Sequence, residues 1–364
     1  MDIANLALAT SLAQQCSVDE QIELVTHRLD TTLAQHPSVY WTKVSRPFGM
    51  NLLGEVVLDR VGRQRAKFAE CAVVNGGNCT IANSINWVHY VHAAYHPTVR
   101  TGLLRRLKAN YHRWRSVRWE RRSLLASRII ICNSQLTANH VIQLVGCDPD
   151  RVRTVYYGID SNQFFPLNAT EKKAARIALG WDDDCPRIVF IGALADDRKG
   201  FDTVFSAWKS ICQKPDWRGR LVVIGSGAAV PIWHQRAKDD GLADSIDFLG
   251  FRKDVPDLLR AADLLVAPTR YEAYGLGVHE AICCGLPVLV TRETGMGERF
   301  PKELDSLLLD TAESPALLVD KLRLWQAGLL CKDEAIQAFS KQLRNRSWQD
   351  MAIEFVATCE DRKI

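Results

Sequence analysis

Residues 271–281 read YEAYGLGVHEA and place two glutamates, Glu272 and Glu280, on either side of a Gly-Leu-Gly turn. An apolar run precedes this stretch at residues 264–268, and another follows at residues 285–290. This order indicates a strand, a loop, a short helix and a second strand. Ligands of an open parallel sheet bind at the loops that follow the carboxyl ends of its strands. The stretch therefore predicts an α/β fold with a ligand site in this loop.

The loop also offers the chemistry that a nucleotide-sugar requires. Its glycines let backbone N–H groups approach a ligand closely, and the positive end of the following helix attracts an anion. The backbone can therefore hold a phosphate, while Glu272 and Glu280 accept hydrogen bonds from hydroxyl groups. A nucleotide-sugar carries both a diphosphate and hydroxyls.

Short apolar segments alternate with helical segments through the second half of the chain. Helices are expected at residues 199–212, 233–239 and 254–262. Strands are expected at residues 187–192, 221–225, 246–250, 264–269 and 287–291. The alternation predicts a parallel sheet that is buried on both faces.

The first half is similar but less regular. A helix at residues 4–15 is followed by expected strands at residues 22–26, 72–75, 87–92, 128–133 and 152–157. A polar stretch at residues 160–186, which contains Pro166 and Pro186, is interpreted as a linker. The two halves together predict two Rossmann-like domains that face each other across a cleft.

The predicted domains follow from this division. The first covers residues 1–165 and the second covers residues 166–345. A C-terminal segment at residues 346–364 is expected to be mostly helical.

The composition is that of an ordinary globular protein. The chain has 364 residues, of which 47% are hydrophobic and 24% are charged. No apolar run approaches the roughly 20 residues that a membrane-spanning helix needs. The first sixteen residues are interpreted as an amphipathic helix rather than a signal peptide, because Asp2 stands where a positive charge belongs. The eleven cysteines lack Cys-x-x-Cys spacing, which favours thiols in a reducing compartment and predicts a cytoplasmic protein.

Positive charge is concentrated in residues 100–128, where Glu120 is the single acidic residue. Tryptophan and leucine are interleaved with the arginines, as in surfaces that contact anionic lipid. Three interpretations stay open: a solvated helix face, a peripheral contact with an anionic membrane, and a surface that binds nucleic acid. The region could also receive an acidic or phosphorylated acceptor. Nucleic acid is the least favoured partner and is not expected.

Several ordered segments resemble glycosyltransferase family 4. They are the Glu-x7-Glu loop at 272–280, FIG at 190–192 with RKG at 198–200, FLG at 248–250, IIICNS at 129–134 and YGID at 157–160. Their order and spacing agree with the family from about residue 127 to residue 300. The resemblance implies a GT-B fold and a retaining, nucleotide-sugar-dependent glycosyltransferase of the hexosyltransferase type. It implies no metal and no cofactor besides the nucleotide-diphosphate sugar donor, with a glycan, lipid-linked or other hydroxyl acceptor.

The resemblance also implies roles for charged residues. Glu272 would bind hydroxyls of the donor sugar, and Glu280 would bind the ribose. Lys199 would neutralise the diphosphate, a task that suits a compact ammonium group. Family members usually carry an arginine directly after the glycine that ends the first strand of this domain, whereas here Ala193 follows Gly192. Arg198, next to Lys199, is the candidate substitute.

Other candidate contacts follow in the same way. Backbone N–H groups near Tyr274, Gly275 and Leu276 would bind the diphosphate. Arg252 would lie near the base. His92 stands where the family often has a histidine near the sugar, with His89 as the competing residue. The final helix is expected to cross back to the first domain.

The beginning of the chain departs from the family. Members open with a strand and a Gly-Gly loop near the donor phosphates, whereas this chain begins with what resembles the following helix. Gly76-Gly77 lies elsewhere in the order. We expect an N-terminal domain without its first strand, either because the sequence lacks its true start or because a diphosphate contact is missing.

Two other functions remain open. A non-catalytic subunit that binds a nucleotide-sugar or glycan for a partner enzyme is favoured by Ala193 and by the missing loop. An adaptor that acts through the basic segment is the other alternative. Epimerisation of a nucleotide-sugar would use the same fold.

Overall fold

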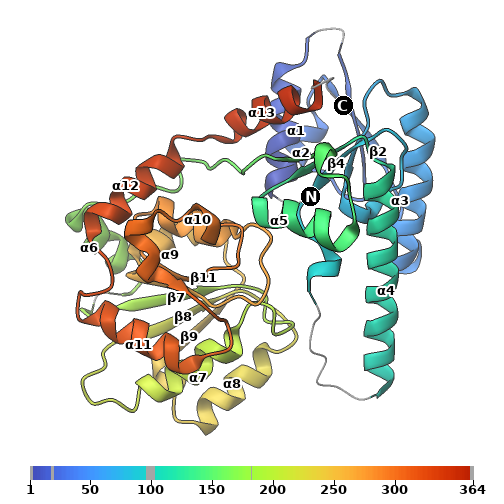
Figure 1. Ribbon diagram of the computed structural model, residues 1–364. Coiled ribbons are helices and arrows are strands. Elements are labelled where there is room, and N and C mark those ends of the chain that lie inside the picture. Colours follow the sequence, from blue (N-terminus) through green and yellow to red (C-terminus); the bar gives the residue numbers. More distant parts are fainter. Residues whose placement is uncertain (1–2, 18–19, 96–102, 182, 361–364) are drawn as a thin grey trace. The chain divides into compact units, whose positions relative to one another are not determined.

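The computed structural model describes residues 3–17, 20–95, 103–181 and 183–360, which form two units (Figure 1). Of the described residues, unit 1 contains those up to 95, those from 103 to 158 and those from 346 onward, and unit 2 contains those from 159 to 345. Each unit has a parallel sheet and its own hydrophobic core.

The sheet of unit 2 has six parallel strands in the order β12-β11-β10-β7-β8-β9. Their bounds are β7 Arg187–Ile191, β8 Arg220–Ile224, β9 Ile246–Gly250, β10 Leu264–Ala267, β11 Val288–Thr291 and β12 Leu308–Leu309. Strand order reverses beside β7, because β8 and β9 follow on one side while β10 to β12 follow on the other. Such a reversal opens a crevice at the carboxyl ends of the two central strands. In this unit those strands are β7 and β10.

Helices cover both faces of that sheet. They are α6 Ala169–Ala178, α7 Phe201–Ile211, α8 Val230–Asp239, α9 Val255–Ala261, α10 Leu276–Cys283, α11 Pro315–Gln326 and α12 Asp333–Arg344. Figure 1 shows α9 and α10 on one side of the strands and α7, α8 and α11 on the other. The central strands are consequently buried on both faces, as in β10, where all four residues are buried.

Unit 1 holds two separate parallel sheets. One pairs β1 Ile22–Thr26 with β2 Val39–Lys43, and the other has the order β3-β4-β5-β6. The strands of the larger sheet are β3 Val73–Asn75, β4 Ile85–Val88, β5 Ile129–Cys132 and β6 Val152–Thr154. The helices of this unit are α1 Ile3–Gln15, α2 Thr31–Ala34, α3 Asn51–Arg65, α4 Leu103–Ala126, α5 Gln135–His140 and α13 Trp348–Glu360.

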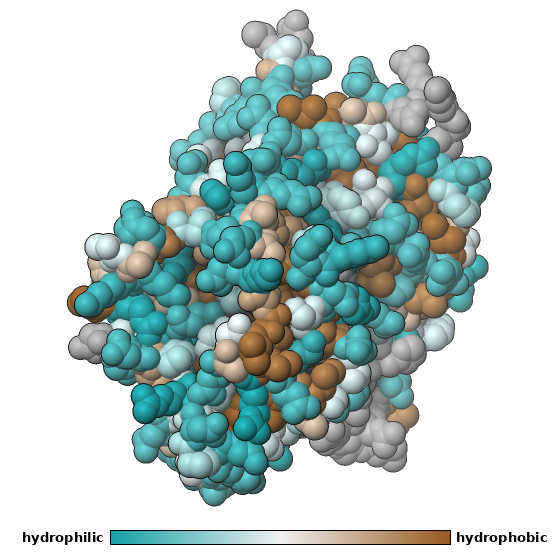
Figure 2. All heavy atoms as spheres, turned by 60° about the vertical axis from the view of Figure 1, so that its left-hand side comes forward, coloured by the Kyte–Doolittle hydropathy of each residue, from teal (hydrophilic) through white to brown (hydrophobic). Residues whose placement is uncertain are grey.

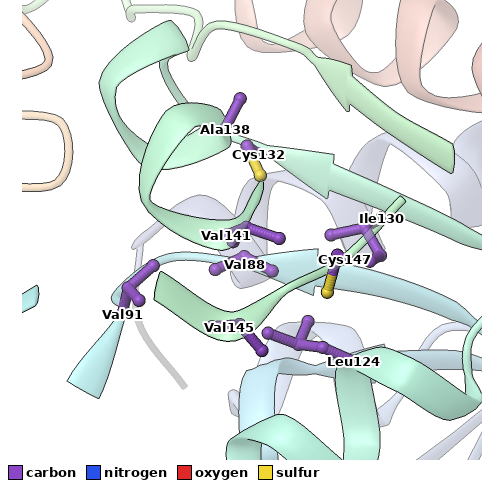
Figure 3. Packing of buried hydrophobic residues seen from close by; sticks show 9 residues of the cluster. All are labelled: Val88, Val91, Leu124, Ile130, Cys132, Ala138, Val141, Val145 and Cys147. Carbon is purple, nitrogen blue, oxygen red and sulfur yellow. The ribbon is translucent and has the colours of Figure 1, made fainter. Parts of the chain in front are cut away.

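A core cluster joins the larger sheet of unit 1 to its helices. Figure 3 shows side chains from β4, β5, α4 and the helical segment after β5 meeting around Val88 and Val141. Leu124, from α4, is fully buried in this cluster. Val91, just past the end of β4, is fully buried there as well. The cluster therefore fixes the helix α4 and the segment that follows β4 against each other.

The aromatic side chains of α13 also belong to unit 1. Phe355 packs against Trp87 of β4 with ring centroids 5.1 Å apart, and Trp348 lies 5.8 Å from Tyr157. Arg346 donates hydrogen bonds of 3.1 and 2.9 Å to the backbone oxygen of Tyr156. The C-terminal segment is thus tied to β4 and to the chain just after β6; its residues 361–364 lie outside the described residues.

Most elements expected from the sequence are present, and the fold class of two Rossmann-like α/β units is confirmed. Three details were wrong. The stretch interpreted as a linker contains α6, which begins with a capping box between Asn168 and Glu171. The strand expected at 87–92 is β4 and ends at Val88, so His92 lies in a 3-10 turn, His92–Ala94. Strands β2 and β12 were not anticipated.

Hydrophilic side chains cover most of the face shown in Figure 2, and hydrophobic ones reach the surface there in several separate places. In the part of the chain that is described, no helix combines the length and the apolar character needed to cross a membrane.

Candidate functional site

The carboxyl ends of β7 and β10 bring Lys199 and Glu272 together. Lys199 follows β7 and Glu272 follows β10, and the Lys199 ammonium is ion-paired with Glu272 Oε2. The Arg198 guanidinium lies 3.8 Å from the same oxygen. All three side chains are about one-fifth exposed, at 21% for Arg198, 19% for Lys199 and 17% for Glu272. Two cations and a carboxylate are therefore accessible at the point where strand order reverses.

The loop between β10 and α10 brings backbone donors to the same place. Gly275 is the N-cap of α10 and has φ +99°, a left-handed conformation that favours glycine. The helix begins at Leu276, so Glu280 lies in its second turn. The first N–H groups of a helix have no partner within it, and they attract anions.

Tyr274 anchors this loop through its side chain. Its side chain is buried, and its hydroxyl lies 3.0 Å from His279 Nδ1 and accepts a 3.0 Å hydrogen bond from Arg299 Nη1. The Tyr274 ring thus supports the loop, which leaves its backbone as the part that can bind a ligand. His279 is fully buried, as expected for a residue with a structural role.

Lys199 stands before its helix rather than inside it. The helix was expected to begin at Lys199, but α7 begins at Phe201 with Gly200 as the N-cap. The Lys199 stem lies over Gly192, where an added Cβ would come within 3.0 Å of Lys199 Cγ. Gly192 therefore leaves room for the lysine stem at the end of β7.

Arg270 links the segment that follows β7 to the end of β10, and it is not among the site residues predicted from the sequence. Its guanidinium donates to both carboxylate oxygens of Asp202 at 2.7 and 2.9 Å and to Glu313 at 2.6 and 2.9 Å. It also donates to the backbone oxygen of Asp197, and its own backbone N–H donates to Arg198 O at 2.8 Å. These carboxylates raise the pKa of Arg270 further above its usual value. The feature of the sequence that could have indicated this role is an arginine two residues before Glu272, just after the end of a predicted strand.

Glu280 has a different electrostatic setting from Glu272. It lies in α10 and is only partly exposed, and burial raises its pKa to about 8. Among the described residues, none forms a hydrogen bond or an ion pair with its carboxyl group that would offset this effect. Near neutral pH the group is thus largely protonated, and it can donate as well as accept a hydrogen bond.

Arg252 lies between β9 and α9 and is paired with Asp254. Its Nε donates to Asp254 Oδ1 at 2.7 Å, and its Nη2 pairs with the other oxygen. This carboxylate raises the pKa of Arg252. The structure thus gives Arg252 a local partner, while its predicted proximity to a base stays a prediction.

The two candidate histidines lie in unit 1. His89 is enclosed between Tyr157 and Asn75, with a 3.1 Å contact from Nε2 to Asn75 Oδ1. His92 is 43% exposed, and its Nδ1 lies 3.0 Å from Glu120 Oε1. Both histidines are partly exposed.

Two family profiles match the chain one after the other. A profile described as "Glycosyltransferase Family 4" matches residues 21–163, and one described as "Glycosyl transferases group 1" matches residues 185–327. The chain belongs to glycosyltransferase family 4.

Curated relatives support this family membership. D-inositol 3-phosphate glycosyltransferase 2 of Catenulispora acidiphila is 34% identical over 176 residues, covering 46% of this chain and 40% of the relative. Mannosylfructose-phosphate synthase of Agrobacterium fabrum is 25% identical over 245 residues, covering 65% and 53%. The chain thus spans about half the length of the curated relatives it matches.

Solved structures of similar architecture match this chain over nearly its whole length. HepE of Anabaena, in complex with UDP and glucose, superposes with a TM-score of 0.72 at 18% identity, covering 99% of this chain and 96% of HepE. WaaG, a glycosyltransferase involved in lipopolysaccharide biosynthesis, gives 0.73 at 18% identity, covering 98% and 95%. Sucrose-phosphate synthase of Thermosynechococcus elongatus gives 0.74 at 18% identity, covering 97% and 90%. These likenesses show the fold, which is GT-B with two Rossmann-like domains.

Proposed function

We propose that this protein transfers a sugar, with retention of anomeric configuration, from a nucleotide-diphosphate donor to an acceptor hydroxyl. The observation that carries the proposal is the meeting of Lys199, Arg198 and Glu272 beside the N-terminus of α10, where strand order reverses. The cations and the helix N-terminus favour a diphosphate, and the carboxylate favours sugar hydroxyls. In the free protein the charges of Lys199 and Glu272 neutralise each other. When a donor binds, its diphosphate would pair with Lys199 and its sugar hydroxyls would bind Glu272.

Transfer requires stabilisation of the departing diphosphate. Lys199, Arg198 and the N–H groups at the start of α10 supply positive charge that is already in place, which is the form of stabilisation that lowers a barrier most. We therefore propose that no metal ion takes part, and that chelation with EDTA leaves the rate unchanged. Loss of activity on chelation, restored by Mg²⁺ or Mn²⁺, would contradict this part.

The direct test uses the Glu272→Ala variant. Purified chain is incubated with UDP-, GDP- and ADP-sugars, and both binding and slow donor hydrolysis are measured. We expect Glu272→Ala to lower hydrolysis or transfer by at least about 100-fold, because removing a group that acts on the transition state typically costs about 3 kcal/mol. Glu293→Ala, at an exposed glutamate of the same unit, is the matched control and leaves the rate unchanged. Equal rates for the two variants would exclude the site.

A second candidate is a subunit that binds the donor without transferring it. Ala193, which stands where the family usually has an arginine, favours this alternative. The position of Arg198 weighs against it, because its guanidinium lies within 3.8 Å of Glu272. Calorimetry that detects donor binding while no hydrolysis or transfer follows would favour the binding subunit.

We also propose that α4 contacts an anionic membrane surface, so that the acceptor is lipid-linked. Leu107, Tyr111 and Trp114 recur at helical spacing and are each more than half exposed. Arg118 lies over the Trp114 ring at 5.8 Å from its centroid, and Lys108 is also exposed. Exposed aromatic rings among basic side chains suit the boundary of an anionic bilayer. Residues 100–102, which begin the predicted basic stretch, lie outside the described residues.

Vesicle sedimentation tests the membrane contact. Binding to phosphatidylglycerol vesicles, weakened by salt and absent with phosphatidylcholine, is expected. Trp114→Ala combined with Tyr111→Ala should abolish it, whereas Ile353→Ala, at an exposed residue of α13, should not. If wild type, the Trp114→Ala/Tyr111→Ala variant and Ile353→Ala all bind the vesicles equally, the proposal is contradicted. A preference of the chain for RNA over vesicles would contradict it as well.

A further inference from the structure

The single acidic residue of the basic helix α4 points into the protein. Glu120 is 1% exposed, although nearly all its charged neighbours in the helix reach the surface. A buried carboxylate is costly unless hydrogen bonds or opposite charge compensate it. The contacts of the Glu120 carboxylate therefore indicate its role.

Among the described residues, the hydrogen bonds to the Glu120 carboxylate all come from His92. Oε1 accepts the His92 backbone N–H at 2.9 Å and lies 3.0 Å from the ring atom Nδ1. The other oxygen, Oε2, is buried without a partner. Because an ionised carboxylate only accepts hydrogen bonds, this arrangement favours the imidazole form that carries its hydrogen on Nδ1. The remaining ring nitrogen, Nε2, is then an acceptor on a side chain that is 43% exposed.

Both partners are held rigidly. The 3-10 turn Gly76–Asn78 packs against α4 at this point, and a Cβ on Gly77 would come within 2.9 Å of Glu120 Cα and N. Gly76-Gly77 thus lets the turn approach α4, a role that was not predicted from the sequence. The His92 side is fixed by Val91, which is buried in the cluster of Figure 3 together with Leu124, one turn after Glu120.

We propose that Glu120 is a positioning residue for His92. It holds the imidazole with its hydrogen on Nδ1, so that Nε2 accepts a hydrogen bond from a hydroxyl of the sugar substrate. This inference rests on the proposed function, because it assigns a ligand to His92. It also makes a claim about the free protein, the tautomer of His92, which can be tested without any donor.

The test is ¹⁵N NMR of histidine-labelled full-length chain, with the His92 signals assigned by their loss in His92→Gln. In Glu120→Leu the side chain is similar in size but offers no oxygen to either the backbone N–H or Nδ1 of His92. We expect the wild-type ring to carry its hydrogen on Nδ1 and Glu120→Leu to shift it toward Nε2. Ser123→Ala, which removes a buried hydroxyl of α4 that donates to Cys79 O, is the control for packing damage and leaves the tautomer unchanged.

Kinetics then test the role in transfer. Glu120→Leu should lower kcat/KM about tenfold, which is the lower end of the effect of removing a hydrogen-bond partner from a metal-binding histidine. In the His92→Gln background the same substitution should have no further effect. An unchanged tautomer in Glu120→Leu, or an equal rate loss in both backgrounds, would overturn the inference. If the wild-type chain shows no transfer activity, the proposed function is contradicted instead. The tautomer comparison would still test whether Glu120 sets the tautomer of His92.

Discussion

At the scale of single residues, the two glutamates of the Glu-x7-Glu loop have opposite electrostatic settings. Glu272 is paired with Lys199 and lies near Arg198, whereas burial raises the pKa of Glu280 to about 8. The sequence predicts that both bind hydroxyls, but it carries no information on this difference. Ionisation depends on what surrounds the carboxyl group in the folded state, and those neighbours come from distant parts of the chain.

The Glu280 setting makes stability depend on pH. Its folded pKa of about 8 lies above the roughly 4.3 of an unfolded glutamate. Between these pH values the unfolded chain has lost the proton that the folded chain keeps, so this group lowers stability as pH rises, by up to about 1.4 kcal/mol per pH unit. Glu280→Gln should therefore gain stability relative to wild type from pH 5 to pH 8 in urea unfolding. If the difference in unfolding free energy between wild type and Glu280→Gln is the same at every pH, the raised pKa of Glu280 is refuted.

At the scale of elements, Arg270 links the end of β10 to the segment that precedes α7. Arg270→Met should lower unfolding free energy by about 2 kcal/mol, because hydrogen bonds to charged groups are lost and Asp202 stays partly buried. Donor affinity should fall at least tenfold, because Lys199 and Arg198 lie in the segment that Arg270 holds. Calorimetry with UDP and denaturant titration measure the two effects.

A matched control exists in the same unit. Arg292 also pairs with two carboxylates, Asp305 and Asp310, but its side chain is 45% exposed. Arg292→Met should therefore cost less than about 1 kcal/mol and leave donor affinity unchanged. Similar losses of donor affinity in both variants would show that Arg270 has no specific role in the site.

Most strands could be predicted from the sequence, because fully buried strands appear as short apolar runs with glycine at the end. Strand β9, for example, has the predicted bounds. Strand β2 was missed although its sequence, VYWTK, is rich in the β-branched and aromatic residues that strands favour. Helix α6 was missed because prolines and acids flank it, although Asn168 and Glu171 provided a capping signal. In the site, Lys199 and Glu272 were found by motif, whereas Arg270 could only be recognised once Asp202 and Glu313 were placed beside it.

At the scale of the whole molecule, the chain passes from unit 1 into unit 2 after Gly158 and returns to unit 1 at Arg346. Consecutive C-terminal helices therefore belong to different cores. Phe339 of α12 packs on Phe300 in unit 2 with ring centroids 5.3 Å apart, whereas Phe355 of α13 packs on Trp87 in unit 1. Both phenylalanines are almost fully buried, at 2% and 1% exposure. They form a matched pair that reports on the two cores separately.

Removing either ring should weaken one unit and spare the other. Phe355→Ala and Phe339→Ala each remove a buried aromatic ring, which typically costs about 3–5 kcal/mol. In hydrogen-exchange mass spectrometry, Phe355→Ala should speed exchange in β3 to β6 of unit 1 and leave β7 to β11 protected, because the lost contacts lie in the first core. Phe339→Ala should give the reverse pattern. If both substitutions speed exchange equally throughout the chain, the two units unfold as one cooperative body, and the C-terminal helix cannot be assigned to the first core on energetic grounds.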